Sequence, residues 1–129
     1  MTTELCYLAL VATFTAFMWI PYILNLMMVR GIPAAVGYPE NPAPLAPWAQ
    51  RMKAAHANAV ENLVVFAALV MVANTVVATS SCTAAAAAVY FWARVVHFFA
   101  YTFRVPWVRT IAFVASWAAQ IAFAWQILM

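Results

Sequence analysis

Four polar residues that could bind an anion or a cation lie on one side of a helix predicted for residues 51–62: Arg51, Asn58, Glu61 and Asn62. At about 100° per residue they cover an arc of roughly 100°. Lys53 and His56 project from other sides of this helix, and we expect both on the surface. A charged side chain within a membrane helix usually faces protein or a water-filled cavity and has a partner. We therefore expect a cation to pair with Glu61.

A second polar stripe lies further along the chain and consists of Tyr90, Arg94, His97, Tyr101 and Arg104. Spacings of three and four residues keep these side chains within roughly an 80° arc of a helix. Arg94 lies about 15 Å from Arg104, and Glu61 lies about 15 Å from Arg51, at 1.5 Å per residue. Two antiparallel helices would bring Glu61 and Arg94 to the same depth. We predict that they form a buried pair, and a purely structural ion pair remains an alternative.

The residues around this pair exceed what a structural ion pair needs. Donors and cations are expected at the same membrane face: Asn58, Asn62, His97, Tyr101, Arg104, Arg109 and Thr110. Since the cluster has only one carboxylate, it suits a small polar anion with carboxylates of its own. No metal site is predicted, because the two histidines lie on different helices with no cysteine nearby.

The elements that position these residues are membrane helices. The chain has 129 residues, of which 69% are hydrophobic and 7% charged, far from the roughly 25% charged residues of soluble domains. Four apolar runs of about 20 residues each could span a bilayer, over residues 5–29, 57–79, 84–103 and 108–128. The alternation of a β-barrel is absent. We expect an all-α, integral membrane bundle of four helices that forms one domain over residues 1–129.

The predicted helices run from Leu5 to Val29, Trp48 to Ala78, Ala84 to Phe103 and Trp107 to Leu128. Pro21 is expected to kink the first helix, and the proline-rich residues 31–47 are expected to form an irregular loop. Lys and Arg flank the first and third connections, which predicts that these are cytoplasmic and that both termini are not. Cys6 and Cys82 are expected to be plain small residues, although a disulfide between them is geometrically conceivable.

Three motifs give the chain a resemblance to the MAPEG family, the membrane-associated proteins of eicosanoid and glutathione metabolism. They are Ala55-His56-x-Asn58-x-x-Glu61-Asn62, Arg94-Val-Val-His97-x-x-x-Tyr101 and Pro106-x-x-Arg109-Thr110. The length, the four apolar runs and the long first connection agree with it, so the resemblance covers essentially the whole chain. It is closest to small bacterial-type members, which implies a location in the bacterial inner membrane.

The resemblance implies a left-handed four-helix bundle that assembles as a homotrimer. Glutathione would bind between subunits near the cytoplasmic side, and a lipophilic substrate would approach from the bilayer. Matching positions imply that Arg109 stabilises the thiolate and that Thr110 replaces a serine seen in some members. The residues expected to bind glutathione are Arg30, Arg51, Asn58, Glu61, Arg94, His97 and Tyr101. The implied activity is that of a glutathione-dependent transferase or peroxidase acting on lipophilic electrophiles or hydroperoxides.

Three positions depart from the eicosanoid enzymes. Ala54 and Ala57 replace basic residues, and Phe113 replaces an aromatic hydroxyl. Losing two anion contacts would weaken binding by a few kcal/mol, at about 1.5–3 kcal/mol for each charge-assisted bond. Arg51 and Lys53 compensate for this loss, or the thiol ligand differs, or catalysis is lost. Two other functions therefore stay open: a non-catalytic lipid- or partner-binding member of the family, and a small proton-coupled multidrug transporter with one buried glutamate.

Overall fold

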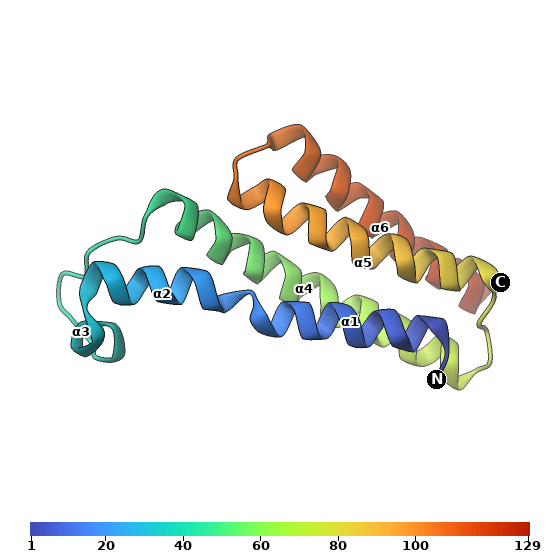
Figure 1. The fold of residues 1–129 in the computed structure, drawn as a ribbon. Coiled ribbons are helices and arrows are strands. Elements are labelled where there is room, and N and C mark those ends of the chain that lie inside the picture. Colours follow the sequence, from blue (N-terminus) through green and yellow to red (C-terminus); the bar gives the residue numbers. More distant parts are fainter.

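Helices form almost the whole chain in the computed structural model, which describes all residues from Met1 to Met129. They are α1 (Thr3–Phe17), α2 (Trp19–Arg30), α3 (Ile32–Val36), α4 (Pro47–Thr75), α5 (Ser81–Thr102) and α6 (Pro106–Leu128). In Figure 1, α1 and α2 run end to end beside α4, and α5 and α6 form an antiparallel pair. Both termini lie at the same end of the bundle. The prediction of an all-α fold is confirmed.

Four helical segments are long and apolar enough to cross a membrane. The first combines α1 and α2 over 28 residues, and the others are α4, α5 and α6 with 29, 22 and 23 residues. At 1.5 Å per residue these segments measure about 33–44 Å, which exceeds the roughly 30 Å of a hydrocarbon core. Together with their composition, this confirms the prediction of a multi-pass membrane protein.

The first span is interrupted at Met18, three residues before Pro21. Proline has no N–H to donate to the carbonyl group four residues earlier, and its ring clashes with that carbonyl group. Met18 instead donates its N–H to the Thr15 carbonyl at 3.2 Å, a tighter turn than an α-helix makes. The kink expected at Pro21 is therefore a break between two helices, located one turn earlier.

The connection after α2 is more ordered than the irregular loop predicted from its prolines. It includes α3, whose start follows Gly31 at a φ of 77°, a left-handed conformation that glycine adopts without strain. Arg30 Nε donates to the Ala43 carbonyl at 2.7 Å, and Asn25 Oδ1 accepts from the Ala46 amide at 2.9 Å. Two side chains of α2 thus stabilise the segment that leads into α4 by hydrogen bonds to its backbone.

The α4–α5 turn begins at Val76, because α4 ends at Thr75, three residues before the predicted end. Ser80 and Thr83 then form a reciprocal capping box at the start of α5. The Thr83 hydroxyl also contacts the buried Glu4 carboxyl group of α1, so the N-terminus packs against this turn.

Both cysteines, Cys6 and Cys82, are free and exposed in the structure. The structure thus contains no disulfide between them, and neither side chain is part of the buried core.

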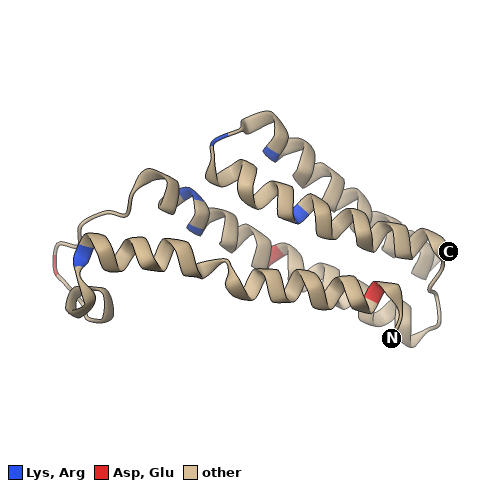
Figure 2. Ribbon diagram, in the orientation of Figure 1, with Lys and Arg blue, Asp and Glu red and all other residues tan.

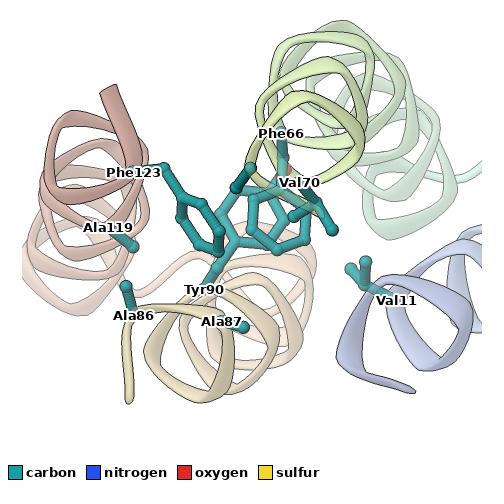
Figure 3. Packing of buried hydrophobic residues seen from close by; sticks show 9 residues of the cluster. Val11, Phe66, Val70, Ala86, Ala87, Tyr90, Ala119 and Phe123 are labelled. Carbon is teal, nitrogen blue, oxygen red and sulfur yellow. The ribbon is translucent and has the colours of Figure 1, made fainter. Parts of the chain in front are cut away.

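Two apolar clusters hold the bundle together. In the first, Phe66 of α4 stacks on Tyr90 of α5 with ring centres 3.7 Å apart, and Phe123 of α6 meets Phe66 edge-on at 5.7 Å. Figure 3 shows small side chains, Ala86 and Ala119, facing each other between α5 and α6, which lets these helices approach closely. The second cluster joins α2, α4 and α5 and includes Met18, Tyr22, Ala49, Met52, Ala55, Ala59 and Phe98.

Charged residues are distributed unevenly along the bundle. Lys and Arg gather toward the end that holds α3 and the α5–α6 turn (Figure 2). The structure agrees here with the sequence, in which basic residues flank the first and third connections. We call this the arginine-rich end, and it is where the candidate site lies.

Candidate functional site

A buried polar layer separates the two apolar clusters, and Arg94 of α5 is its centre. The guanidinium group is 1% exposed. Arg94 Nη2 donates to Asn58 Oδ1 at 2.7 Å and lies 3.4 Å from His97 Nδ1, while Nη1 donates to Ser116 Oγ at 3.5 Å. Arg94 Nε is buried without a hydrogen-bond partner. A fully buried cation is therefore held by neutral groups alone.

The predicted pair between Glu61 and Arg94 is wrong for this chain. Arg94 binds Asn58, and Glu61 is exposed on the surface of α4. The matching depth of α4 and α5 was predicted correctly, since a residue of the same polar stripe reaches Arg94. Asn58 and Glu61 are three residues apart, however, and point about 60° apart around a helix. α5 packs against the Asn58 side and leaves Glu61 outside.

The polar layer extends from Asn58 to α6. Asn62 Nδ2 donates to the Asn58 carbonyl at 2.9 Å and lies 3.3 Å from Asn58 Oδ1. Gln120 Nε2 of α6 donates to the Asn62 carbonyl at 3.2 Å. Three helices are thus joined by hydrogen bonds inside an otherwise apolar bundle, where each unsatisfied polar group would cost free energy.

A cleft with three arginines opens at the arginine-rich end, and we call it the arginine cleft. It has a volume of about 240 Å³ and is lined by Arg51, Ala100, Tyr101, Arg104, Val105, Pro106 and Arg109. No carboxylate is among these residues, so their positive charge is not neutralised within the cleft. The cleft is thus suited to an anion of more than one charge.

Side-chain contacts hold two of the three arginines, and helix termination places the third. Arg51 Nε donates to the Thr102 carbonyl at 2.9 Å, which leaves its terminal nitrogens available. The Arg109 guanidinium carbon lies 5.1 Å from the centre of the Tyr101 ring, a cation–π geometry. Arg104 occupies the left-handed region at a φ of 60°, which is unusual for a residue other than glycine. It is the αL residue that ends α5, so helix termination places its side chain at the cleft.

His97 connects the buried layer to the arginine cleft. It is 2% exposed, contacts Arg94 on one side, and meets the Tyr101 ring edge-on at 5.7 Å on the other. Phe113 of α6 lies 6.2 Å from the same imidazole. Arg94, His97, Tyr101 and Arg109 therefore form a continuous series of contacts from the protein interior to the cleft.

Three predicted site residues belong neither to the arginine cleft nor to the buried polar layer around Arg94. Arg30 lines a separate hollow beside the α2–α4 connection, where its Nε binds the Ala43 carbonyl. Glu61 is exposed on α4, and the Thr110 hydroxyl donates to the Pro106 carbonyl at 3.0 Å in the first turn of α6. Lys53 is exposed, as predicted. A single chain thus assembles Arg51, Tyr101 and Arg109 in the cleft. Asn58, Arg94 and His97 form the buried layer, which contacts the cleft through Tyr101.

The structure also adds polar residues that the sequence did not single out. Ser116 and Gln120 of α6 belong to the buried layer, and their spacing of four residues within an apolar run was the available signal. The expectation that His56 is a surface residue is wrong. Its Nδ1 lies 2.6 Å from the hydroxyl of the buried Tyr22, and the imidazole is only partly exposed.

An apolar groove continues from the arginine cleft along the outer face of α5 and α6. Its first part, of about 340 Å³, shares Ala100 and Val105 with the cleft. Its second part, of about 400 Å³, shares Val96 and Val108 with the first. Every residue lining these two parts is hydrophobic, and the polar cleft therefore borders an apolar groove at Ala100 and Val105.

Comparison with known proteins gives one match. The sequence model of the MAPEG family matches residues 8–129, which is nearly the whole chain. No curated protein and no solved structure matches the chain.

Proposed function

Because the chain belongs to the MAPEG family, we propose that it binds glutathione in the arginine cleft and activates the thiol for reaction with lipophilic compounds. The observation that supports this most strongly is a cleft with three arginines and no carboxylate. Glutathione has two carboxylates and a thiol that ionises, so its charge complements these residues. Arg51 and Arg104 are placed to bind carboxylates, since a guanidinium can bind a carboxylate through two parallel hydrogen bonds.

Arg109 is the residue we propose for thiol activation. A free thiol has a pKa near 8.5 and is mostly protonated at neutral pH, and a nearby arginine favours the thiolate. The contact with Tyr101 restrains the Arg109 guanidinium at 5.1 Å from the ring centre. Thr110 stabilises the helix turn that positions Arg109, because its hydroxyl binds the Pro106 carbonyl.

The proposed reaction is nucleophilic attack by the thiolate. With an aryl halide, the sulfur–carbon bond forms, the carbon–halogen bond breaks, and the halide leaves, while the thiol proton has already passed to solvent. With a hydroperoxide, two glutathione molecules are oxidised to the disulfide, and the peroxide is reduced to an alcohol and water. The apolar groove supports a lipophilic second substrate, because it lies on the hydrophobic surface of α5 and α6 and shares Ala100 and Val105 with the cleft.

The exposed position of Glu61 supports assembly into a homotrimer. Glu61 is 14 residues beyond Pro47, about 21 Å along the α4 helix. A carboxylate this far into a membrane span needs polar surroundings. Val60, Val64 and Ala68 are also exposed on α4, so a second chain could cover this face. We propose that the trimer closes the site there, with Glu61 near the glutathione amine and Arg30 contributed from the adjacent chain.

The departures at positions 54 and 57 favour a second candidate, a family member that binds a ligand without catalysis. Ala54 and Ala57 are exposed and supply no charge. In the proposed enzyme, Arg51 and Arg104 compensate for both missing cations. Family membership gives no support to the proton-coupled transporter.

Calorimetric titration of glutathione into the purified protein in mild detergent tests the binding site. Arg51→Leu and Arg104→Leu should each raise the Kd about 10- to 100-fold, from charge-assisted bonds of about 1.5–3 kcal/mol. Lys53→Leu is the matched control, because it removes an exposed cation outside the cleft and should leave the Kd unchanged. Absence of binding by the unmodified protein at millimolar glutathione would refute the proposal.

Turnover of an aryl halide or a lipid hydroperoxide separates the two candidate functions. Arg109→Leu should abolish turnover, while Glu61→Gln should mainly weaken glutathione binding, since Glu61 is proposed to contact the amine and not the sulfur. Glutathione binding without turnover of either compound would favour the non-catalytic candidate.

A further inference from the structure

We propose that Arg94 is a positioning residue, which fixes the amide orientation of Asn58 and the tautomer of His97, so that each side chain has an N–H group directed away from the buried guanidinium. Arg94 itself is 1% exposed and cannot touch a ligand in the cleft. Its effect passes through the two side chains that it binds. The identity of the ligand rests on the proposed function, but the orientation of both side chains is a property of the chain without ligand.

The orientation of the Asn58 amide follows from the chemistry of its neighbours. Arg94 Nη2 lies 2.7 Å and Asn62 Nδ2 lies 3.3 Å from Asn58 Oδ1. Both nitrogens can only donate hydrogen bonds, so the atom between them must be the amide oxygen. Asn58 Nδ2, with two hydrogens, therefore points away from the buried guanidinium. Asn58 is partly exposed, in contrast to Arg94.

The tautomer of His97 follows in the same way. Arg94 Nη2 lies 3.4 Å from His97 Nδ1. Since a guanidinium has no acceptor, Nδ1 must be the accepting, unprotonated nitrogen. A neutral imidazole then has its hydrogen on Nε2. The structure places no acceptor of the chain on Nε2, and the ring lies against Tyr101, which lines the arginine cleft. His97 is therefore a neutral hydrogen-bond donor.

Burying the charge of Arg94 costs folding free energy, which a purely structural role does not explain. Its charge is buried without a carboxylate partner, and its Nε has no hydrogen bond. Well-packed apolar side chains are often as stabilising as buried ion pairs, which have better partners than this arginine. A guanidinium at this position orients two neighbouring side chains. Because it only donates hydrogen bonds, it binds only the oxygen of Asn58 and only the unprotonated nitrogen of His97.

Nitrogen-15 NMR of histidine-labelled protein tests this orientation without any ligand. The chain has 2 histidines, and His56→Gln assigns the remaining signal to His97. We expect a single neutral tautomer of His97 with hydrogen on Nε2, and a mixture of both tautomers in Arg94→Leu. A His97 ring protonated at Nδ1, or already mixed in the unmodified protein, would overturn the proposal whether or not the variant folds.

Asn58→Asp separates the positioning role from a structural one. The aspartate keeps an oxygen toward Arg94, so the melting temperature should be equal or higher, but it replaces the outward NH₂ group by a second oxygen. We expect the Kd for glutathione to rise at least 10-fold. Asn74→Asp is the matched control, since Asn74 Oδ1 accepts from the Thr2 hydroxyl at the opposite end of the bundle. It should leave the Kd unchanged.

The outcomes distinguish the two proposals. If Asn58→Asp leaves the glutathione affinity unchanged, the outward NH₂ group of Asn58 does not contribute to binding. The positioning role of Arg94 toward Asn58 would then be refuted as well. If the unmodified protein binds no glutathione, the proposed function fails, and the His97 tautomer still decides whether Arg94 positions its neighbours.

Discussion

Replacing Asn58 by leucine removes the closest hydrogen-bond acceptor of a guanidinium that is buried inside the bundle. The lost bond, from Arg94 Nη2 to Asn58 Oδ1, is 2.7 Å long. The remaining contacts of the charge, to Ser116 and His97, measure 3.5 and 3.4 Å. A hydrogen bond to a charged group contributes about 1.5–3 kcal/mol, and leaving a buried charge without its partner costs about 3–5 kcal/mol. We therefore expect Asn58→Leu to lower the free energy of unfolding by about 3–4 kcal/mol.

Arg94→Leu should be much milder, although it removes the same hydrogen bond. The charge and its desolvation cost disappear together, and Asn58 Oδ1 keeps Asn62 Nδ2 within 3.3 Å. We expect a loss of about 1 kcal/mol, because a neutral acceptor with a remaining partner costs little. The double variant should then resemble Arg94→Leu alone, which corresponds to a coupling energy of about 3–4 kcal/mol between the two residues.

A double-mutant cycle measured by reversible unfolding in detergent checks these values. Glu61→Gln with Arg94→Leu provides the control cycle, since Glu61 is exposed and does not bind Arg94. This second cycle should be additive within about 0.5 kcal/mol. The reasoning is refuted if Glu61 and Arg94 show the larger coupling, or if Asn58→Leu costs no more than Arg94→Leu.

Three further predictions concern the surroundings of the site and the opposite end of the bundle. Arg51→Leu should lower the free energy of unfolding by about 1.5–3 kcal/mol, through loss of the bond to the carbonyl at the end of α5; an unchanged denaturant midpoint would contradict this. Ser80→Ala should cost about 1 kcal/mol because it removes the capping box of α5, and thermal unfolding at constant detergent concentration measures the loss. Cys6 and Cys82 should both react with a maleimide without reductant, since both are free and exposed; fewer than two adducts by mass spectrometry would show that one is blocked.

The fold was predictable because the membrane leaves few choices for so apolar a chain. Backbone groups must be satisfied within helices, and the four apolar runs gave spans close to those observed. The predicted positions of helix ends were less accurate, because contacts with other parts of the chain help to decide where a helix ends. The break at Met18 comes from the effect of Pro21 one turn earlier, and α3 appears within a segment whose prolines suggested an irregular loop.

The sequence predicted which residues form the polar layer, but it did not predict which residue binds Arg94. Helical periodicity placed Asn58 and Glu61 on the same side of α4, and could not say which of them faces α5. That choice depends on how the small residues of α4 pack against α5, as at Ala55 and Ala59, which share a buried cluster with Phe98. The periodicity of α5 was sufficient to bring Arg94, His97 and Tyr101 together, because all three belong to one stripe of one helix.

Ultraviolet difference spectroscopy of the protein with glutathione tests the central proposal most directly, because the thiolate absorbs where the thiol does not. We predict that glutathione added near neutral pH gives thiolate absorbance accompanied by release of one proton for each thiolate formed. Arg109→Leu should abolish the signal, and Arg109→Lys should retain part of it, since lysine keeps the charge without the planar guanidinium. Binding of glutathione with no thiolate absorbance, or an undiminished signal in Arg109→Leu, would contradict the proposal.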